Sequence, residues 1–121
     1  MRRVHGELLL PANAPAGVAR KGVIEVRDVS LQDAPSVVVA SKSLSKVALQ
    51  PAGRLAFELE VPEAQPGRTL NLRVHFAVTP RAKGVALSET VEPGDLLTTE
   101  SIPVPAAGDY GPLRVRLALI S

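Results

Sequence analysis

Residues 54–61 read RLAFELEV, and residues 69–78 read TLNLRVHFAV. In both stretches apolar side chains alternate with polar or small ones along the chain. A β-strand turns successive side chains to opposite faces, so this pattern is typical of a strand with one face in a core and the other in water. A third stretch, LRVRLALI at 113–120, repeats it. The three stretches predict an all-β fold with Phe57 and Phe76 on the core side.

Other segments extend this interpretation outward along the chain. Eleven prolines and nine glycines separate short apolar segments. Such spacing predicts an antiparallel β-sandwich of about seven to eight short strands, with a small barrel as the alternative. No linker divides the chain, so residues 1–121 are expected to form a single β-sandwich domain. The further strands are expected at residues 4–10, 22–29, 37–43, 96–104 and, as a short one, 46–49; only residues 30–33 could form a single helical turn.

Composition excludes several classes of function. Apolar residues make up 45% and charged residues 21% of the chain, which is typical of a globular protein. The absence of cysteine excludes disulfides, thiolate catalysis and cysteine-bound zinc. The net charge is +2 and no basic run exceeds Arg2-Arg3, so nucleic-acid binding is not supported. No stretch approaches the roughly 20 apolar residues of a membrane span.

Groups able to carry chemistry are few. The two histidines, His5 and His75, are interpreted as surface residues, and a metal site would need three or four converging ligands. Counting leaves a Ser-His-Asp triad open, but no serine lies in a G-x-S-x-G elbow. Glu58 and Glu60 project from one face of a strand and are expected to keep that surface soluble. Tyr110 is expected to pack its loop against the sandwich. We predict no catalytic, metal-binding or cofactor-binding residue and no cofactor.

The most distinctive segment is VRDVSLQDAPSVVVASKSL at residues 26–44. Asp28, Ser30 and Asp33 have short polar side chains that can bond nearby backbone amides, and Pro35 keeps the preceding residue out of the helical region. The motif is therefore expected to be architectural. It resembles the YbaY/YscW family of small bacterial envelope lipoproteins, in which a strand runs into a D-V-S-x-x-D-A-P turn and then a valine-rich strand. The matching residues are Asp28, Val29, Ser30, Asp33, Ala34 and Pro35.

The resemblance extends more weakly over most of the chain, through residues 6–8, 57–59 and 96–104. It implies a non-catalytic envelope domain with a protein partner; some members are pilotins, which bind a secretin subunit and support its assembly. The family's lipobox cysteine is missing, and the apolar run after Met1-Arg2-Arg3 is shorter than a signal peptide requires. The expected location is therefore the envelope or periplasm if a targeting segment was removed upstream, and otherwise the cytoplasm.

A second resemblance covers residues 87–102, which are similar to the signature of antifreeze-like, SAF-type domains. Its matching residues are Val91, Gly94, Leu97, Thr98 and Ile102. Three functions therefore remain open at this point: an envelope domain that binds protein through a sheet edge or an exposed apolar patch, a small-ligand carrier or hydrolase using His5 or His75, and a structural accessory module.

Overall fold

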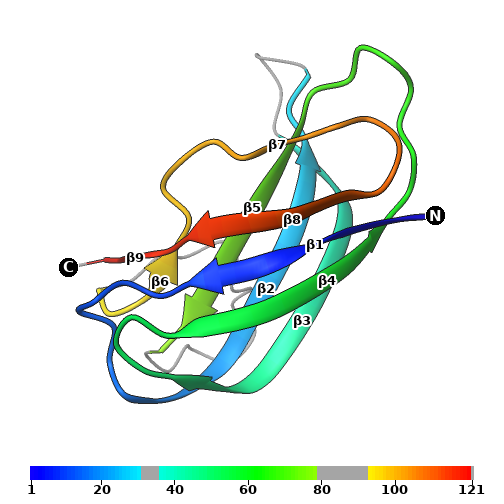
Figure 1. Ribbon diagram of the computed structural model, residues 1–121. Coiled ribbons are helices and arrows are strands. Elements are labelled where there is room, and N and C mark those ends of the chain that lie inside the picture. Colours follow the sequence, from blue (N-terminus) through cyan, green and yellow to red (C-terminus); the bar gives the residue numbers. More distant parts are fainter. Residues whose placement is uncertain (31–35, 79–92, 121) are drawn as a thin grey trace.

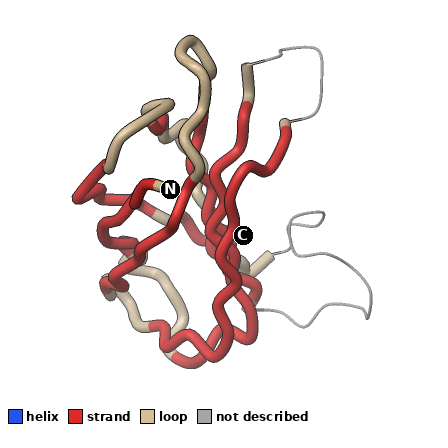
Figure 2. Tube along the Cα trace, turned by 90° about the vertical axis from the view of Figure 1, so that its right-hand side faces the viewer, coloured by secondary structure: helices blue, strands red, loops and turns tan. Residues whose placement is uncertain are grey.

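The computed structural model describes residues 1–30, 36–78 and 93–120, and these residues form strands and loops with no helix (Figures 1 and 2). The strands are β1 (Arg2–Leu9), β2 (Gly17–Asp28), β3 (Val37–Leu49), β4 (Arg54–Val61), β5 (Leu70–Ala77), β6 (Leu96–Leu97), β7 (Pro103–Val104), β8 (Tyr110–Arg116) and β9 (Ala118–Leu119).

Two sheets face each other across the core. Sheet A has the order β4-β1-β8, and sheet B has the order β3-β2-β5-β6-β9, with β7 also paired to β5. In Figure 1 the strands of sheet A run across those of sheet B, which lies behind them. Most neighbours are antiparallel, but β1 and β8 are parallel. The fold is a β-sandwich, as the sequence predicts, and not a closed barrel.

The three strongly alternating stretches are strands, and their apolar faces form the core. Phe57 is 7% exposed and Phe76 is fully buried, which confirms their predicted positions. The side chains of the core come from both sheets, so the two layers share one apolar interior. Its largest fully buried apolar side chains are Phe76, Leu8, Ile24, Leu70, Leu72 and Leu96.

Several strand predictions differ in extent from the structure. The strand predicted at 22–29 is β2, which begins at Gly17. Residues 37–43 and 46–49 belong to one continuous strand, β3, in which Lys46 adopts a positive φ of 53°. Residues 96–104 form only the two-residue strands β6 and β7. Pro103 lies in β7, and a proline has no amide hydrogen with which to extend a ladder. The possible helical turn at 30–33 falls mostly outside the described residues.

The sandwich is closed along one side by a chain that changes sheets. The stretch predicted as one strand at 113–120 is interrupted at Leu117, so β8 lies in sheet A and β9 in sheet B. The Leu117 amide still donates to the Leu9 carbonyl at 3.0 Å, while the Ile120 amide donates to the Asp95 carbonyl at 2.9 Å. Because the same chain bonds to both layers, it joins them at this side.

The opposite side of the sandwich is bounded by two edge strands, β3 in sheet B and β4 in sheet A. They are connected by the turn at residues 50–53, in which Ala52 has a positive φ of 55°. This turn is fixed to the end of β1, because the Ala52 amide donates to the Pro11 carbonyl at 2.9 Å and the Leu10 amide donates to the Gly53 carbonyl at 2.9 Å. Beyond the turn, β3 and β4 belong to different sheets, and we call the region between them the open side.

Candidate functional site

The structure places the two histidines in different environments. His75 is fully buried, and its Nε2 lies 2.8 Å from Oδ2 of Asp95, which is also fully buried. The interpretation of His75 as a surface residue was therefore wrong. His75 does lie on the outward-facing side of β5, but the chain entering β6 brings the Asp95 carboxylate against it. This contact spans 20 residues of sequence, and strand alternation alone carries no signal for it.

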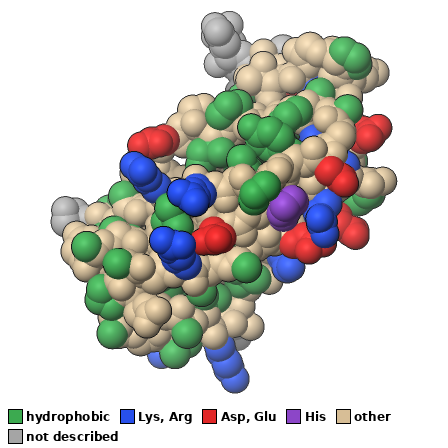
Figure 3. Space-filling model, in the orientation of Figure 1, with side chains coloured by type: hydrophobic (Ala, Val, Ile, Leu, Met, Phe, Trp, Pro, Cys, Tyr) green, Lys and Arg blue, Asp and Glu red, His purple; other side chains and the backbone are tan. Residues whose placement is uncertain are grey.

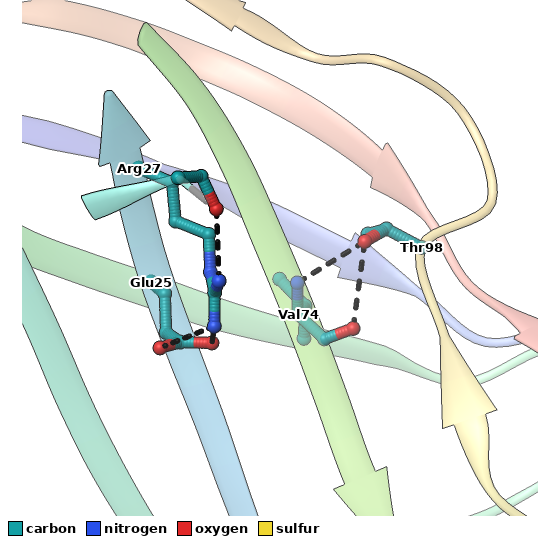
Figure 4. A network of polar contacts seen from close by, with 5 residues as sticks. Glu25, Arg27, Val74 and Thr98 are labelled. Carbon is teal, nitrogen blue, oxygen red and sulfur yellow. Dashed lines mark hydrogen bonds and ion pairs between the residues drawn. The ribbon is translucent and has the colours of Figure 1, made fainter. Parts of the chain in front are cut away.

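The His75–Asp95 pair has the properties of a structural link between β5 and the start of β6. A hydrolytic His-Asp pair must reach both a nucleophile and a substrate, whereas both of these side chains have no exposed surface. The hydroxyl of Thr98, just beyond β6, is also engaged: it accepts the Val74 amide at 3.2 Å and donates to the Val74 carbonyl at 3.5 Å (Figure 4). The Thr98 amide donates to the same carbonyl at 3.0 Å.

His5 and Tyr110 meet at the junction of β1 and β8. His5 is half-buried on the outer face of sheet A, and its ring lies so close to Gly111 that a Cβ there would stand 3.0 Å from its Nε2. Tyr110 is half-buried and packs against the core, in agreement with the predicted packing role, although it begins β8 and does not lie in a loop. Glu58 and Glu60 are both exposed on one face of β4, as expected.

The described part of the D-V-S motif is architectural, as predicted. The amide and the hydroxyl of Ser30 both donate to Oδ1 of Asp28, at 2.9 and 2.6 Å. Ser30 Oγ in turn accepts the Thr69 amide at 2.8 Å, and Arg68 Nε lies 3.2 Å from Asp28 Oδ2. These bonds tie the end of β2 to the start of β5. Asp33, Ala34 and Pro35 lie outside the described residues, as does Val91 of the SAF-like stretch.

A second polar cluster lies on the outer face of sheet B, where β2 passes between β3 and β5. Arg27 Nη2 lies 3.3 Å from Oε1 and 3.4 Å from Oε2 of Glu25, and its Nη1 donates to Ser36 Oγ at 2.9 Å (Figure 4). Glu25 is only 5% exposed. A carboxylate buried this far is costly unless it is paired, so Arg27 is expected to stabilise Glu25 and to fix the chain that enters β3.

The open side is the candidate interface, because two strand edges meet there. A free edge presents unpaired amide and carbonyl groups, which is a template for another chain. Across the middle of the opening, Lys42 of β3 donates from Nζ to the carbonyl of Glu58 in β4 at 3.2 Å. Lys46 adds a second charge and a backbone kink on β3. The segment 37–41 at the start of β3 contains a β-bulge at Val39, and in it Val37 is 63% and Val38 42% exposed.

The described residues also include a small hollow at one end of the sandwich. A hollow of about 210 Å³ lies beside the turn between β3 and β4 and is smaller than most ligand sites. Within the described ranges, no three His, Asp or Glu side chains gather closely enough to hold a metal ion. In the same ranges, no helix has the length and apolar character needed to cross a membrane. The hollow is lined by Leu10, Ala48, Leu49, Gln50, Gly53, Arg54 and Leu55.

Comparison with known proteins identifies one solved structure with the same architecture. The chain is similar to an alternative pilotin from the type II secretion system of Vibrio cholerae, with a TM-score of 0.59 and 16% sequence identity. The similarity covers 97% of this chain and 96% of the pilotin. No family model matches the sequence, and no curated protein matches it either. The similarity therefore establishes a pilotin-like fold.

Proposed function

We propose that this chain is a non-catalytic accessory domain that binds a protein partner at the cell envelope, in the manner of a pilotin. The observation that carries the proposal is the match to a pilotin fold over nearly the whole length of both chains. The D-V-S turn resembles that of the YbaY/YscW lipoproteins and supports the same proposal. This resemblance lies in the sequence and does not depend on the structural match. On this proposal residues 1–121 act as one domain, and no residue is catalytic.

The open side is the surface that we assign to the partner. On the opposite side the chain changes sheets at Leu117, so β8 continues into paired structure in sheet B. On the open side β3 is the last strand of sheet B among the described residues, and its segment 37–41 carries the exposed Val37 and Val38. An extended segment of a partner can add to such an edge through main-chain hydrogen bonds, while side-chain contacts supply selectivity.

Binding to a secretin subunit is the direct test. We expect the purified chain to bind the secretin subunit of its own host, and ¹⁵N-labelled protein to show shifted amide signals in 37–41 upon titration. Val38→Lys should weaken this binding about tenfold or more, because it places a charge in the contact. Val18→Lys is the matched control, since Val18 is also an exposed valine but lies near the other end of β2 and β3.

Three outcomes separate the parts of the proposal. If the chain binds no secretin subunit and fractionates with the cytosol of its host, the envelope function is wrong. If it binds but the amide shifts fall on sheet A, the function stands and the assigned surface is wrong. If Val18→Lys weakens binding as much as Val38→Lys, the effect is not specific to the edge, and the assignment of 37–41 is again wrong.

A further inference from the structure

The outer face of sheet A carries charges in an ordered pattern. The pairing of its strands places outward-facing residues in rows across β4, β1 and β8, with one β-bulge in β8 opposite His5. Asp109, which directly precedes β8, joins the last row because its Oδ1 accepts the Arg3 amide at 2.9 Å. We call this surface the charged face. Its rows are Arg54-Leu9-Arg116, Ala56-Glu7-Arg114, Glu58-His5 with Pro112 in the bulge of β8, and Glu60-Arg3-Asp109.

The two ends of the charged face have opposite sign. The end formed by the first two rows holds three arginines and one glutamate, and the end formed by the last two holds three carboxylates and one arginine. Figure 3, which looks onto this face, shows blue side chains gathered towards one end and red ones towards the other. The net charge of the whole chain is only +2, so the polarity is local to this surface.

Contacts within the chain engage part of this charge only loosely: Arg3 Nη1 lies 3.8 Å from Glu58 Oε2, and both side chains are more than half exposed. Arg54 Nη1 lies 3.9 Å from Glu7 Oε2, and both side chains are about half exposed or more, at 72% and 47%. Such long, exposed pairs contribute little energy. Among the residues that the structure describes, Arg114, Arg116 and Glu60 form no ion pair, and all three are exposed. The face is therefore able to pair with charges from outside the chain.

We propose that the charged face binds the same face of a second copy of this chain, related by a two-fold axis that runs across the strands. This axis reverses the strand direction and keeps each strand opposite its own counterpart. Arg54 then lies opposite Glu60 of the second copy, and Arg116 lies opposite Asp109. In a two-fold interface every such contact occurs twice, so two kinds of pair give four ion pairs.

The register selects this axis over the other face-to-face arrangement. A two-fold axis parallel to the strands would keep each row opposite the same row of the second copy. Arg54 would then lie opposite Arg116, and Glu60 would lie opposite Asp109, so like charges would meet at both ends. Opposed like charges disfavour such an association. The pattern of rows thus favours one symmetric arrangement and disfavours the alternative.

The second copy also fits better than other occupants of the face. A surface of uniform charge, whether acidic or basic, would be repelled by one end of it. An apolar partner would find few apolar side chains, since only Leu9, Ala56 and Pro112 interrupt the polar rows. A second copy supplies the required opposite polarity without any further assumption. This inference stands independently of the proposed function, because it uses sheet A and not the open side.

The size of the face predicts a weak, salt-sensitive dimer. Three strands about 4.8 Å apart and four rows about 6.8 Å apart cover roughly 400 Å² on each copy. Such an interface lies below the roughly 1,200 Å² of total buried surface at which stable complexes begin. Its ion pairs are exposed to solvent, so at about 1 M salt, where the Debye length falls to about 3 Å, the attraction between copies should disappear.

Sedimentation equilibrium at low and high salt tests the inference. At high protein concentration in low salt, the mean mass should rise above that of the 12.7 kDa monomer, and about 1 M salt should return it to that value. Arg54→Glu alone and Glu60→Arg alone should each remain monomeric, because each places like charges opposite one another. An equal mixture of the two variants should associate again. In the mixed dimer, position 54 of each variant lies opposite a residue of opposite charge at position 60 of the other.

The same design contains its controls. Arg20→Glu makes the same charge change on β2, away from the charged face, and should associate like the unchanged chain. Far-UV circular dichroism of each variant reports whether it folds. The double variant carrying both Arg54→Glu and Glu60→Arg should recover the dimer even if one single variant folds poorly. A mass of 12.7 kDa for the unchanged chain in low salt overturns the inference, and so does a mixture that remains monomeric.

Discussion

Asp28 is the residue on which the contacts between the end of β2 and the start of β5 converge. The hydroxyl and then the amide of Ser30 lower the pKa of the Asp28 carboxyl by donating hydrogen bonds to it. Partial burial acts in the opposite direction, and the charge of Arg68 lowers the pKa further. The folded state therefore binds the proton at Asp28 less tightly than the unfolded chain does.

This shift makes stability depend on pH in a definite direction. Because the pKa of Asp28 is lower in the folded state, its stabilising contribution is complete above the unfolded pKa of about 3.9 and is lost as the pH falls through the folded value. We expect Asp28→Asn to lower the free energy of unfolding at pH 7, and the difference from the unchanged chain to shrink in acid. Urea unfolding across this pH range measures both.

Glu63→Gln is the matched control, since it removes one exposed carboxylate that accepts no bond from the Ser30 turn. If Asp28→Asn and Glu63→Gln show the same dependence on pH, the stabilisation does not come from the contacts of Asp28. A difference between Asp28→Asn and the unchanged chain that persists undiminished at acid pH would also contradict the assigned cause.

Single residues also show where inference from sequence ends. The bonds between Asp28 and Ser30 could be predicted because the two residues lie two positions apart, so local chemistry decides them, whereas their contacts with Thr69 and Arg68 carry no local signal. The burial of His75 could not be predicted in this way. Its position on the strand faces outward, and it is buried because Asp95, 20 residues later, returns to the same place. The alternation of apolar and polar residues predicts which face of a sheet a side chain occupies. It does not predict whether another segment of the chain covers that face.

At the scale of elements, β3 is the strand most exposed to unwanted pairing. It is 13 residues long and forms the edge of sheet B. Natural edge strands are often protected by a charged side chain that points inward. Lys42 has this position, because it pairs in register with the buried Ile24 and donates to the Glu58 carbonyl in sheet A at 3.2 Å. Lys42 thus occupies the opening between the two edges.

Lys42→Val should therefore allow the edge of β3 to pair with strands of other molecules. The variant replaces the inward-pointing charge with a β-branched apolar residue in a valine-rich strand, so we expect aggregation that increases with protein concentration. Light scattering and thioflavin binding over time measure this property. High salt should not reverse it, which distinguishes it from the weak association of the charged faces.

Lys21→Val is the control for a lost positive charge, since Lys21 is also exposed but lies on β2, which is paired on both sides. Equal aggregation of Lys21→Val and Lys42→Val would show that net charge, and not the edge, controls solubility. A soluble Lys42→Val would show that the kink at Lys46 or another part of the edge is sufficient protection.

Element boundaries show a similar division between what sequence predicts and what it does not. The strand at residues 54–61 is found with its predicted ends, because alternation is regular and breakers flank it. The apparent single strand at 113–120 keeps its alternation across Leu117 although the chain changes sheets there. Alternation continues through the crossing because Val115 and Leu117 both point into the shared core. The sheet that a strand joins depends on which segments, distant in the sequence, it pairs with.

At the scale of the whole molecule, the sandwich has unequal sides. One side is closed by hydrogen bonds from the β8–β9 chain to both sheets, and the other is spanned in its middle by the bond from Lys42 to the Glu58 carbonyl. Within the described ranges, the central strands β2 and β5 have neighbours on both sides, whereas β3 pairs with β2 alone. Local opening should therefore begin at β3, because fewer hydrogen bonds and less buried apolar area resist it.

Native-state hydrogen exchange should reveal this inequality as two levels of protection. Amides of β5 are expected to exchange only through global unfolding, with a dependence on denaturant equal to that of the whole domain. Amides of 37–41 that bond to β2 should exchange through a local opening. Its free energy should be at least about 2 kcal/mol below that of global unfolding, and it should depend very little on denaturant, since little surface becomes exposed. Equal protection of β3 and β5 would mean that the open side is no weaker than the closed one. A partner bound along β3 should raise the protection of 37–41 selectively, because it would pair with the outer edge of this strand.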